Sequence, residues 1–443
     1  MRRIDSSFLW TILLDLVYIA LLPVLCLVLL VASRFLTRPK QRRGLAAKIW
    51  STPKRVGDQR CFWIHAVSVG EVITSVPLVA RLREEYRGWD FRLSVSTYTG
   101  YDVAKKHFPD IPIFYFPLDL SPIVSRFFRR HRPDAVILLE LEMWPNFLLE
   151  ARRRNIPVLV ANGRITERSS RRYAWGRGLT RRTFNLVASF GAQNEEYRER
   201  FLRLGVDPAK VEILGNLKHD REPSPIAAKG PETRERLGWK PGEKLVLVAG
   251  STHPGEEAVF TSLYAQLRQA DDRLRLVLVP RHVERLDDAE LSRWGADRPL
   301  VRWSSIKGAL APLGDVMLVV DTVGELELFY SIADLVFVGG SLVPHGGHNL
   351  FEAARLGKAV CFGPHVANFR EEADLLMREE AALRVAGVPE LRAALQRLIG
   401  SPEARQELGE KALRVTSRLR GAGQRHLDWV GRQLRLYLGS GAC

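Results

Sequence analysis

The strongest local signal in the chain is ADLVFVGGSLVPHGGHNLFEAARLG, from Ala333 to Gly357. An apolar run ends in Gly339 and Gly340, a glycine-rich loop follows, and Asn349 stands where it can cap a helix with Glu352 in its first turn. This order predicts one strand–loop–helix unit of a parallel sheet, with loop amides suited to a phosphate. Asn349 and Glu352 also fit a capping box, and the two roles are compatible.

Apolar runs of the same kind occur on both sides of this stretch, with helix-like segments between them. The first half carries CFWIHAV (61–67), FRLSVST (91–97), IPIFYF (111–116), AVILLE (135–140), IPVLVAN (156–162) and LVASFGA (186–192). The second half carries KLVLVAG (244–250), LRLVLVP (274–280), VMLVVD (316–321), ADLVFVGG (333–340) and KAVCFG (358–363). Continuous rather than alternating apolarity is typical of parallel strands buried on both faces, so each half is predicted to be a doubly wound α/β domain.

A chain of 443 residues exceeds what one hydrophobic core usually supports. We expect a membrane anchor and basic segment at 1–50, a Rossmann-like domain at 51–220, a linker rich in proline and charge at 221–232, and a second Rossmann-like domain with C-terminal helices at 233–443. Two such domains in tandem should face each other across a cleft, with ligands at the carboxyl ends of the strands.

The N-terminal segment from Phe8 to Ala32 is apolar apart from Asp15 and a few polar or helix-disturbing residues. As a helix it would be about 37 Å long, enough to cross a bilayer with tilt. Arginines and lysines follow it directly, which by the positive-inside rule places the rest of the chain in the cytoplasm. A cleaved signal peptide and an amphipathic helix lying in the interface are the alternatives, and Asp15 favours the second of these.

The formal net charge of +16 and a pI of about 10.0 predict an anionic partner. Nucleic acid, an acidic membrane surface and a phosphorylated substrate all fit this charge. The basic clusters lie in the first half, and one of them, 164–182, contains Tyr173 and Trp175, a mixture that suits lipid headgroups. No nucleic-acid-binding motif accompanies the charge, and the four scattered cysteines indicate neither disulfides nor a zinc site.

Three carboxylates of the first half stand at predicted strand ends. Glu71 follows HAVSVG and opens a helix, whose N-terminus favours the ionised form that a general base needs. Glu140 and Glu142 lie two residues apart at the end of AVILL, where a carboxylate is costly unless it is paired or used. The alternatives are a first-turn Glu71 that only complements the helix dipole, and glutamates that are merely paired with nearby arginines.

The second half offers weaker motifs at three other strand ends. GSTHPGEE (250–257) follows a strand and opens a helix, as anion-binding loops do. Pro280, Arg281 and His282 end another strand, and Val323, Gly324 and Glu325 follow a third, although each group would also fit an ordinary turn. We expect the glycine-rich loop to hold a phosphate and Glu352 to accept hydrogen bonds from sugar hydroxyls.

An ordered set of motifs resembles the Kdo transferases, which attach 3-deoxy-manno-octulosonic acid (Kdo) during lipopolysaccharide assembly. The set comprises SVGE, E-x-E-x-W-P-N, ANGR, AQNEE, GNLKHD, GSTHPGEE, VPRH, GEL, GGSL and GGHN-x-x-E, in collinear order from about residue 60 to about residue 370. Such an ordered set is far more specific than any single motif. Leu141, where many relatives carry a small hydroxyl residue, and the pair Leu350 and Phe351 depart from the pattern without removing a charged group.

The resemblance implies a GT-B glycosyltransferase, with the acceptor bound by the first half and the CMP-Kdo donor by the second. Glu71 would be the general base, while Glu140 and Lys218 would stabilise the transition state. The implied CMP contacts are Pro280, Arg281, Val323, Gly324, Glu325, Asn349, Leu350, Phe351 and Glu352.

The expected reaction is inverting transfer of Kdo to a phosphorylated lipid A precursor, lipid IVA, at the cytoplasmic face of the inner membrane. Because the donor carries a single phosphate that Arg281 could neutralise, and no D-x-D motif appears, we expect no metal and no cofactor. Partners would be the donor, the acceptor and an anionic membrane surface, but no nucleic acid. Another GT-B transferase that uses a UDP-sugar and a non-catalytic, membrane-tethered nucleotide-binding scaffold remain the alternatives.

Overall fold

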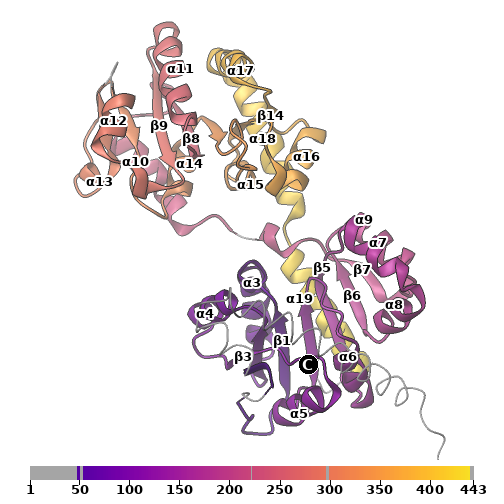
Figure 1. Cartoon of the computed structure of the whole chain (residues 1–443). Helices are drawn as coiled ribbons and strands as arrows, with labels where there is room; N and C mark the ends of the chain where they lie inside the picture. The colour runs from indigo at the N-terminus through magenta and orange to yellow at the C-terminus, as the bar shows by residue number, and fades with distance from the viewer. Residues whose placement is uncertain (1–46, 50–52, 221, 296–298, 440–443) are drawn as a thin grey trace, which may run out of the picture. The chain divides into compact units, whose positions relative to one another are not determined.

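The computed structural model describes residues 47–49, 53–220, 222–295 and 299–439 (Figure 1). The chain divides into two compact units, the first Met1–Arg221 together with Leu419–Cys443 and the second Glu222–Arg418. The expected membrane-anchoring helix, from Phe8 to Ala32, lies outside the described residues. Within the described part of the chain, no helix combines the length and the apolar character that crossing a bilayer requires.

The first unit is built on a seven-stranded parallel sheet in the order β3-β2-β1-β4-β5-β6-β7. Its strands are β1 (Cys61–Ala66), β2 (Asp90–Val95), β3 (Ile113–Tyr115), β4 (Ala135–Leu139), β5 (Val158–Gly163), β6 (Ser189–Ala192) and β7 (Val211–Ile213). Its helices before the C-terminal segment are α3 (Val69–Glu85), α4 (Tyr98–His107), α5 (Ser121–His131), α6 (Pro145–Arg153), α7 (Glu167–Trp175), α8 (Arg177–Phe184) and α9 (Glu195–Arg203), with the short η1 (Pro208–Lys210) and η2 (Leu217–Asp220). The strand order reverses between β1 and β4, the place where sheets of this kind bind ligands.

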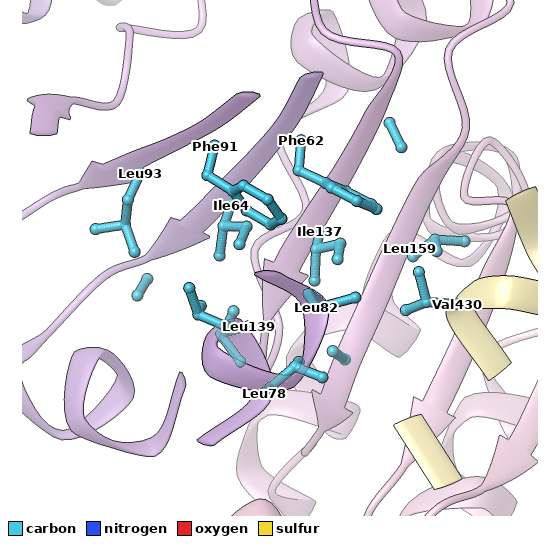
Figure 2. Close-up of a cluster of buried hydrophobic side chains, with 14 of the residues drawn as sticks. Phe62, Ile64, Leu78, Leu82, Phe91, Leu93, Ile137, Leu139, Leu159 and Val430 are labelled. Atoms are coloured by element: carbon cyan, nitrogen blue, oxygen red, sulfur yellow. The ribbon is translucent and has the colours of Figure 1, made fainter. Parts of the chain in front are cut away.

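Both faces of this sheet are buried. Phe62 and Ile64 of β1 belong to one hydrophobic cluster together with Leu78 and Leu82 of α3 (Figure 2). Trp63, which points to the other face, belongs to a second cluster that contains many phenylalanines of α5, α6 and α8. Because alternate residues of one strand enter different clusters, every position of the strand must be apolar, which explains the continuous runs in the sequence.

The C-terminal helix α19 (Ala422–Leu438) belongs to the first unit, although we expected all C-terminal helices in the second domain. Val430 of α19 is buried in the same cluster as Leu159 of β5 (Figure 2). Trp429 and Leu434 of α19 belong to this cluster as well. In Figure 1 the yellow helix lies among the indigo and magenta elements. The apolar stripe of a helix reports that one face is buried but not which sheet buries it, so the sequence could not assign this helix.

The second unit has its own seven-stranded parallel sheet, in the order β10-β11-β9-β8-β12-β13-β14. Its strands are β8 (Leu245–Thr252), β9 (Leu274–Pro280), β10 (Leu300–Arg302), β11 (Met317–Val319), β12 (Leu335–Val338), β13 (Ala359–Phe362) and β14 (Leu383–Arg384). Its α-helices are α10 (Gly230–Arg236), α11 (Glu256–Ala270), α12 (Asp288–Trp294), α13 (Trp303–Ile306), α14 (Leu326–Ile332), α15 (Phe351–Ala354), α16 (Arg370–Arg378), α17 (Val388–Gly400) and α18 (Pro402–Leu419). Here the strand order reverses between β8 and β12, so those strand ends are expected to face a ligand.

The segment 221–232, expected to be a linker, is largely structured. Residues Pro225–Lys229 form the 3-10 helix η3, and α10 begins at Gly230; both pack against α14. A proline stands in the first turn of each helix, where its missing N–H costs nothing and its fixed φ favours a helical start. The prolines in this segment therefore indicate the first turns of two helices and not an irregular linker.

Candidate active site

Glu71 lies in the first turn of α3, directly after β1, at the reversal point of the first sheet. Its Oε2 accepts a hydrogen bond from the backbone N–H of Val67 at 2.8 Å, and its Oε1 accepts one from Ser68 Oγ at 3.2 Å. The carboxylate thus folds back toward the start of α3 and accepts hydrogen bonds from residues just before the helix. Glu71 therefore does stabilise the N-terminus of its helix, which was the alternative to a role as base. The same two hydrogen bonds fix the direction of its side chain.

The electrostatic surroundings of Glu71 suit proton transfer at neutral pH. Burial raises its pKa to about 7, and the negative charges of Glu140 and Glu142 act in the same direction against the two hydrogen bonds. This is opposite to the shift toward the ionised form that the position at a helix N-terminus predicted, because burial has the larger effect. A carboxyl group with a pKa near 7 is a far stronger base than an ordinary glutamate and is still partly ionised at neutral pH. The group can therefore accept a proton from a substrate and release it afterwards.

Glu140 follows β4, the strand beside β1, and its backbone has a φ of 58°. Its N–H donates to Ala161 O at 3.0 Å, and its Oε1 lies 3.9 Å from Lys218 Nζ. A left-handed conformation is uncommon for a residue with a side chain and tends to persist where the surroundings enforce it, often at functional sites. The structure therefore brings together Glu140 and Lys218, two of the residues that the resemblance singled out.

Glu142 also belongs to this neighbourhood. It accepts a hydrogen bond from Trp144 Nε1 at 2.7 Å, and burial together with the charge of Glu140 raises its pKa. None of the three glutamates is neutralised by a short arginine contact among the hydrogen bonds and ion pairs recorded for the described residues. The alternative in which arginines simply pair with Glu140 and Glu142 therefore receives no support from these contacts.

The loop that carries Lys218 is held by Asn162, which sequence reasoning did not single out. Asn162 is fully buried at the end of β5, has a φ of 55°, and its Oδ1 accepts from the N–H of Leu217 at 3.0 Å. Asp220, at the end of the same short helix η2, accepts hydrogen bonds from the N–H groups of Ala422 and Gly423 at the start of α19. The C-terminal helix thus braces the segment that presents Lys218.

In the second unit, the carboxylate of Glu256 occupies part of the loop whose amides the sequence assigned to a phosphate. Glu256 is fully buried at the start of α11 and accepts from the N–H groups of His253, Gly340, Ser341 and Leu342 at 2.8–3.1 Å. The expectation that these glycine-loop amides hold a ligand phosphate is therefore wrong for Gly340. The chain supplies its own anion there, and this carboxylate fixes the loops after β8 and β12 to each other.

Four histidines gather around the same two loops. His253 Nε2 lies 2.9 Å from His348 Nε2, and the His253 ring stacks on His345 and meets His282 edge to face. Burial first, and then the neighbouring imidazoles and Arg281, lower the pKa of both His253 and His348 to about 4. Both rings are therefore neutral at pH 7, and one must donate its Nε2–H to the other.

The residues implied to contact CMP lie on loops after β9, β11 and β12. Pro280 ends β9, and the exposed Arg281 donates its backbone N–H to Thr252 O at 3.0 Å. Val323 is 84% exposed and lies on the loop after β11. Gly324 has a φ of 93°, a conformation that glycine adopts without strain.

Glu325 and Glu352 are fixed before any ligand arrives. Glu325 accepts from Trp303 Nε1 at 3.0 Å and from the Thr322 hydroxyl. Asn349 Oδ1 accepts from the N–H of Phe351 at 3.1 Å, and Asn349 Nδ2 donates to Glu352 at 3.4 Å. The bond from the N–H of Phe351 to Asn349 is the capping contact that the sequence predicted, because Leu350, the residue between them, already has a helical backbone.

Among the described residues, no group of three or more His, Cys, Asp or Glu is arranged to hold a metal ion. Lys218 was found through its motif alone, whereas Asn162 acts through a contact with Leu217, 55 residues away in the chain. The motif ANGR contains Asn162 and was the one available signal for it.

Comparison with known proteins identifies relatives over most of the chain. The profile of a family described as 3-deoxy-D-manno-octulosonic-acid transferase (kdotransferase) matches residues 37–221. The 3-deoxy-D-manno-octulosonic acid transferase of Haemophilus influenzae is 34% identical over 368 residues, which is 83% of this chain and 85% of that protein. The enzyme of the same name from Bordetella pertussis is 34% identical over 388 residues, 83% of this chain and 87% of that protein.

Solved structures show the same architecture at lower identity. MurG from Acinetobacter baumannii superposes with a TM-score of 0.51 at 16% identity, covering 85% of this chain and 100% of that one. At this identity the likeness concerns the fold alone. It supports the assignment of the two parallel-sheet units to the GT-B architecture.

Proposed function

Because the chain belongs to the family of 3-deoxy-D-manno-octulosonic-acid transferases, we propose that it transfers Kdo from CMP-Kdo to a lipid A precursor, lipid IVA. The observation that carries the mechanism is the carboxyl group of Glu71, which lies at the reversal point of the first sheet and has its pKa raised to about 7. A base of this strength is what activation of a sugar hydroxyl at neutral pH requires.

In the proposed reaction, a hydroxyl oxygen of the acceptor attacks the anomeric carbon of Kdo. The bond from that carbon to the phosphate oxygen breaks, CMP leaves with the bonding electrons, and Glu71 takes the hydroxyl proton. One displacement inverts the configuration at the anomeric carbon and passes through an oxocarbenium-like state. Glu140, paired with Lys218 at 3.9 Å, would stabilise the positive charge that develops on the sugar.

The second unit would bind the donor through the loops after β9, β11 and β12. Arg281 would neutralise the single phosphate, and Glu325 and Asn349–Glu352 would contact the nucleoside. Because one phosphate needs only one positive charge for its departure, we propose that the transfer requires no metal ion.

We further propose that the enzyme works at the cytoplasmic face of the inner membrane. The supporting observation lies on α7 and α8, where Trp175 is 95% exposed and Leu179 is 41% exposed among many arginines. Exposed aromatic and aliphatic groups surrounded by cations suit the headgroup region of an anionic bilayer. The membrane surface would thus be a partner, and the N-terminal apolar segment a second attachment.

The deciding experiment is incubation of the purified full-length chain with CMP-Kdo and lipid IVA, with product masses read directly. A mass gain of one or more Kdo units, together with release of CMP, is the expected result. A parallel screen with UDP-sugars tests the alternative donor class. Nucleotide binding without transfer from any donor would favour the scaffold instead.

A further inference from the structure

A cavity of about 610 Å³ lies in the second unit, and apart from His345 and Gly346 of the loop after β12 its lining residues have no part in the site described above. Its polar lining consists of His345, His365, Asn368, Arg370, Asp374 and Arg384. The volume falls within the range of ordinary ligand pockets, about 300–1,000 Å³. The cavity is therefore large enough for a sugar-sized molecule.

Hydrogen bonds join the segments that line this cavity. The N–H of Asn368 donates to Gly346 O at 3.0 Å, Asn368 Nδ2 donates to His345 O at 3.2 Å, and the N–H of His365 donates to Ser341 O at 3.0 Å. Gly346 has a φ of 89°, and a Cβ atom there would stand 2.5 Å from Asn368 Nδ2. The positive φ favours glycine at this position, and the hydrogen bonds hold the two loops together.

The lining carries more positive than negative charge. Arg370 and Arg384 contribute two guanidinium groups against the one carboxylate of Asp374. Arg384 donates from Nη2 to Pro364 O at 2.9 Å, which holds its guanidinium at the wall and leaves further N–H donors on the same group. Guanidinium groups match the planar geometry of a carboxylate better than any other side chain.

The position of the cavity connects it to the donor. Its lining comes from the loops after β12 and β13, from α16 and from Arg384 at the end of β14, and the proposed CMP contacts likewise follow the carboxyl ends of β9, β11 and β12 in the same sheet. The loop after β12 belongs to both places, because His345 lines the cavity and Asn349 begins the proposed nucleoside contact four residues later. The cavity and the proposed nucleoside contact are therefore neighbours along one loop.

We propose that this cavity binds the acidic sugar of the donor, with Arg370 and Arg384 holding its carboxylate. The inference rests on the proposed function, because it takes CMP-Kdo as the donor. It makes Arg370 and Arg384 residues that distinguish an acidic sugar from a neutral one. A phosphate of the acceptor lipid carries similar oxyanion chemistry and is the alternative source that the test must separate.

The test compares the full-length protein with Arg370→Ala, Arg384→Ala and the double variant. Without acceptor present, binding of CMP and of CMP-Kdo is measured by calorimetry. CMP should bind all four proteins equally, whereas each substitution should weaken CMP-Kdo binding by ~10-fold, the usual worth of one charge-assisted hydrogen-bonding group. Arg392→Ala, which removes an exposed arginine of α17 in the same unit, is the matched control and should bind CMP-Kdo like the parent.

Steady-state transfer assays supply the second arm. The KM for CMP-Kdo should rise in the variants while the KM for lipid IVA stays constant. A rise in the lipid KM alone would assign the cavity to the acceptor and overturn the inference. Thermal melting shows whether Arg384→Ala is folded, and Arg370→Ala carries the test by itself if it is not.

Failure of the inference and failure of the proposed function give different results. If the parent transfers Kdo and the variants bind CMP-Kdo as tightly as the parent does, the cavity assignment is wrong and the proposed function stands. If the parent neither binds nor transfers CMP-Kdo, both are wrong.

Discussion

His426 Nε2 accepts a hydrogen bond from the backbone N–H of Asn162 at 3.0 Å, across 264 residues of chain. The other ring nitrogen, Nδ1, donates to Ala422 O at 2.7 Å, so the ring is a neutral imidazole with a defined tautomer. Burial lowers the pKa of His426 to about 4, which keeps the ring neutral at physiological pH. The last helix of the chain is thus bonded to the strand end that positions Leu217 and, next to it, Lys218.

His426→Ala should lower both stability and transfer. It leaves the buried N–H of Asn162 without an acceptor, which costs about 1–3 kcal/mol in the free energy of unfolding. Loosening of Asn162 should also displace Lys218, so kcat should fall more than donor binding. Urea unfolding and steady-state kinetics measure the two effects, and His426→Gln, which retains an acceptor, should recover part of each. Parent-like kinetics in a destabilised His426→Ala would show that α19 acts on stability alone.

Glu71→Gln should reduce transfer by ~10²- to 10⁴-fold, the usual contribution of a general base, and leave CMP binding unchanged. The amide keeps the shape and can still accept from Val67, but it cannot take the acceptor's proton. Single-turnover assays with CMP-Kdo and lipid IVA, alongside calorimetry with CMP, separate chemistry from binding. Turnover within a few-fold of the parent would remove Glu71 from the role of base.

The pH dependence of transfer should report Glu71. Because the ionised form is the base and its pKa is about 7, kcat/KM should rise with pH below 7 and level off above it. In Glu140→Gln the neighbouring negative charge that helps to raise this pKa is lost, so the rising limb should move to lower pH, whatever the change in the maximum rate. Glu150→Gln is the matched control, because Glu150 pairs with Arg154 and does not contribute to the pKa of Glu71. If the rising part of the pH profile stayed at the same pH in Glu140→Gln, the charge of Glu140 would not influence the pKa of Glu71.

The same pKa makes a prediction for stability. The folded-state pKa of Glu71 lies above its unfolded value, so the contribution of this group is fully present below about pH 4.5 and is lost as pH rises through about 7. Relative to the parent, Glu71→Gln should therefore gain about 1 kcal/mol in the free energy of unfolding between pH 5 and pH 8, after allowance for partial solvent exposure. Denaturant titrations of both proteins at the two pH values provide the measurement. An equal difference at both would mean that Glu71 titrates in the ordinary range.

Arg281→Ala should weaken CMP-Kdo binding by ~10-fold or more, because it removes the charge assigned to the phosphate. EDTA should leave the activity of the parent unchanged. Calorimetry and a transfer assay in the presence of chelator test the two statements. Activity that is lost with EDTA and restored by magnesium would contradict metal-free transfer.

Removal of residues 1–33 should leave a folded, active body, because the strands of the first sheet begin at Cys61. Transfer to a detergent-solubilised acceptor should persist, while sedimentation with vesicles should decrease. Residual binding to anionic vesicles should be weakened by salt, since charge attraction is screened within about 8 Å at physiological ionic strength. Equal binding of the truncated protein to neutral and anionic vesicles would rule out electrostatic docking.

The amino-acid sequence by itself determined the two parallel sheets and their inner strands. Eleven apolar runs were expected to be strands, and each forms one, because a strand buried on both faces must be apolar at every position. The edge strands β7, β10 and β14 were missed, since each has only two or three residues and one open side. Glu71, Glu140, Lys218 and the proposed CMP contacts were also reached from motifs, whose loops follow the strands as expected.

Other features were decided by tertiary structure alone. The assignment of α19 to the first unit depends on which sheet accepts Trp429, and no local pattern specifies that. The satisfaction of the Gly340 amide by Glu256 joins segments 84 residues apart. The raised pKa of Glu71 results from burial and from charges on a neighbouring strand end. The local sequence specifies which chemical groups are present. Their hydrogen-bond partners, their burial and the charges around them depend on which distant segments the folded chain brings close together.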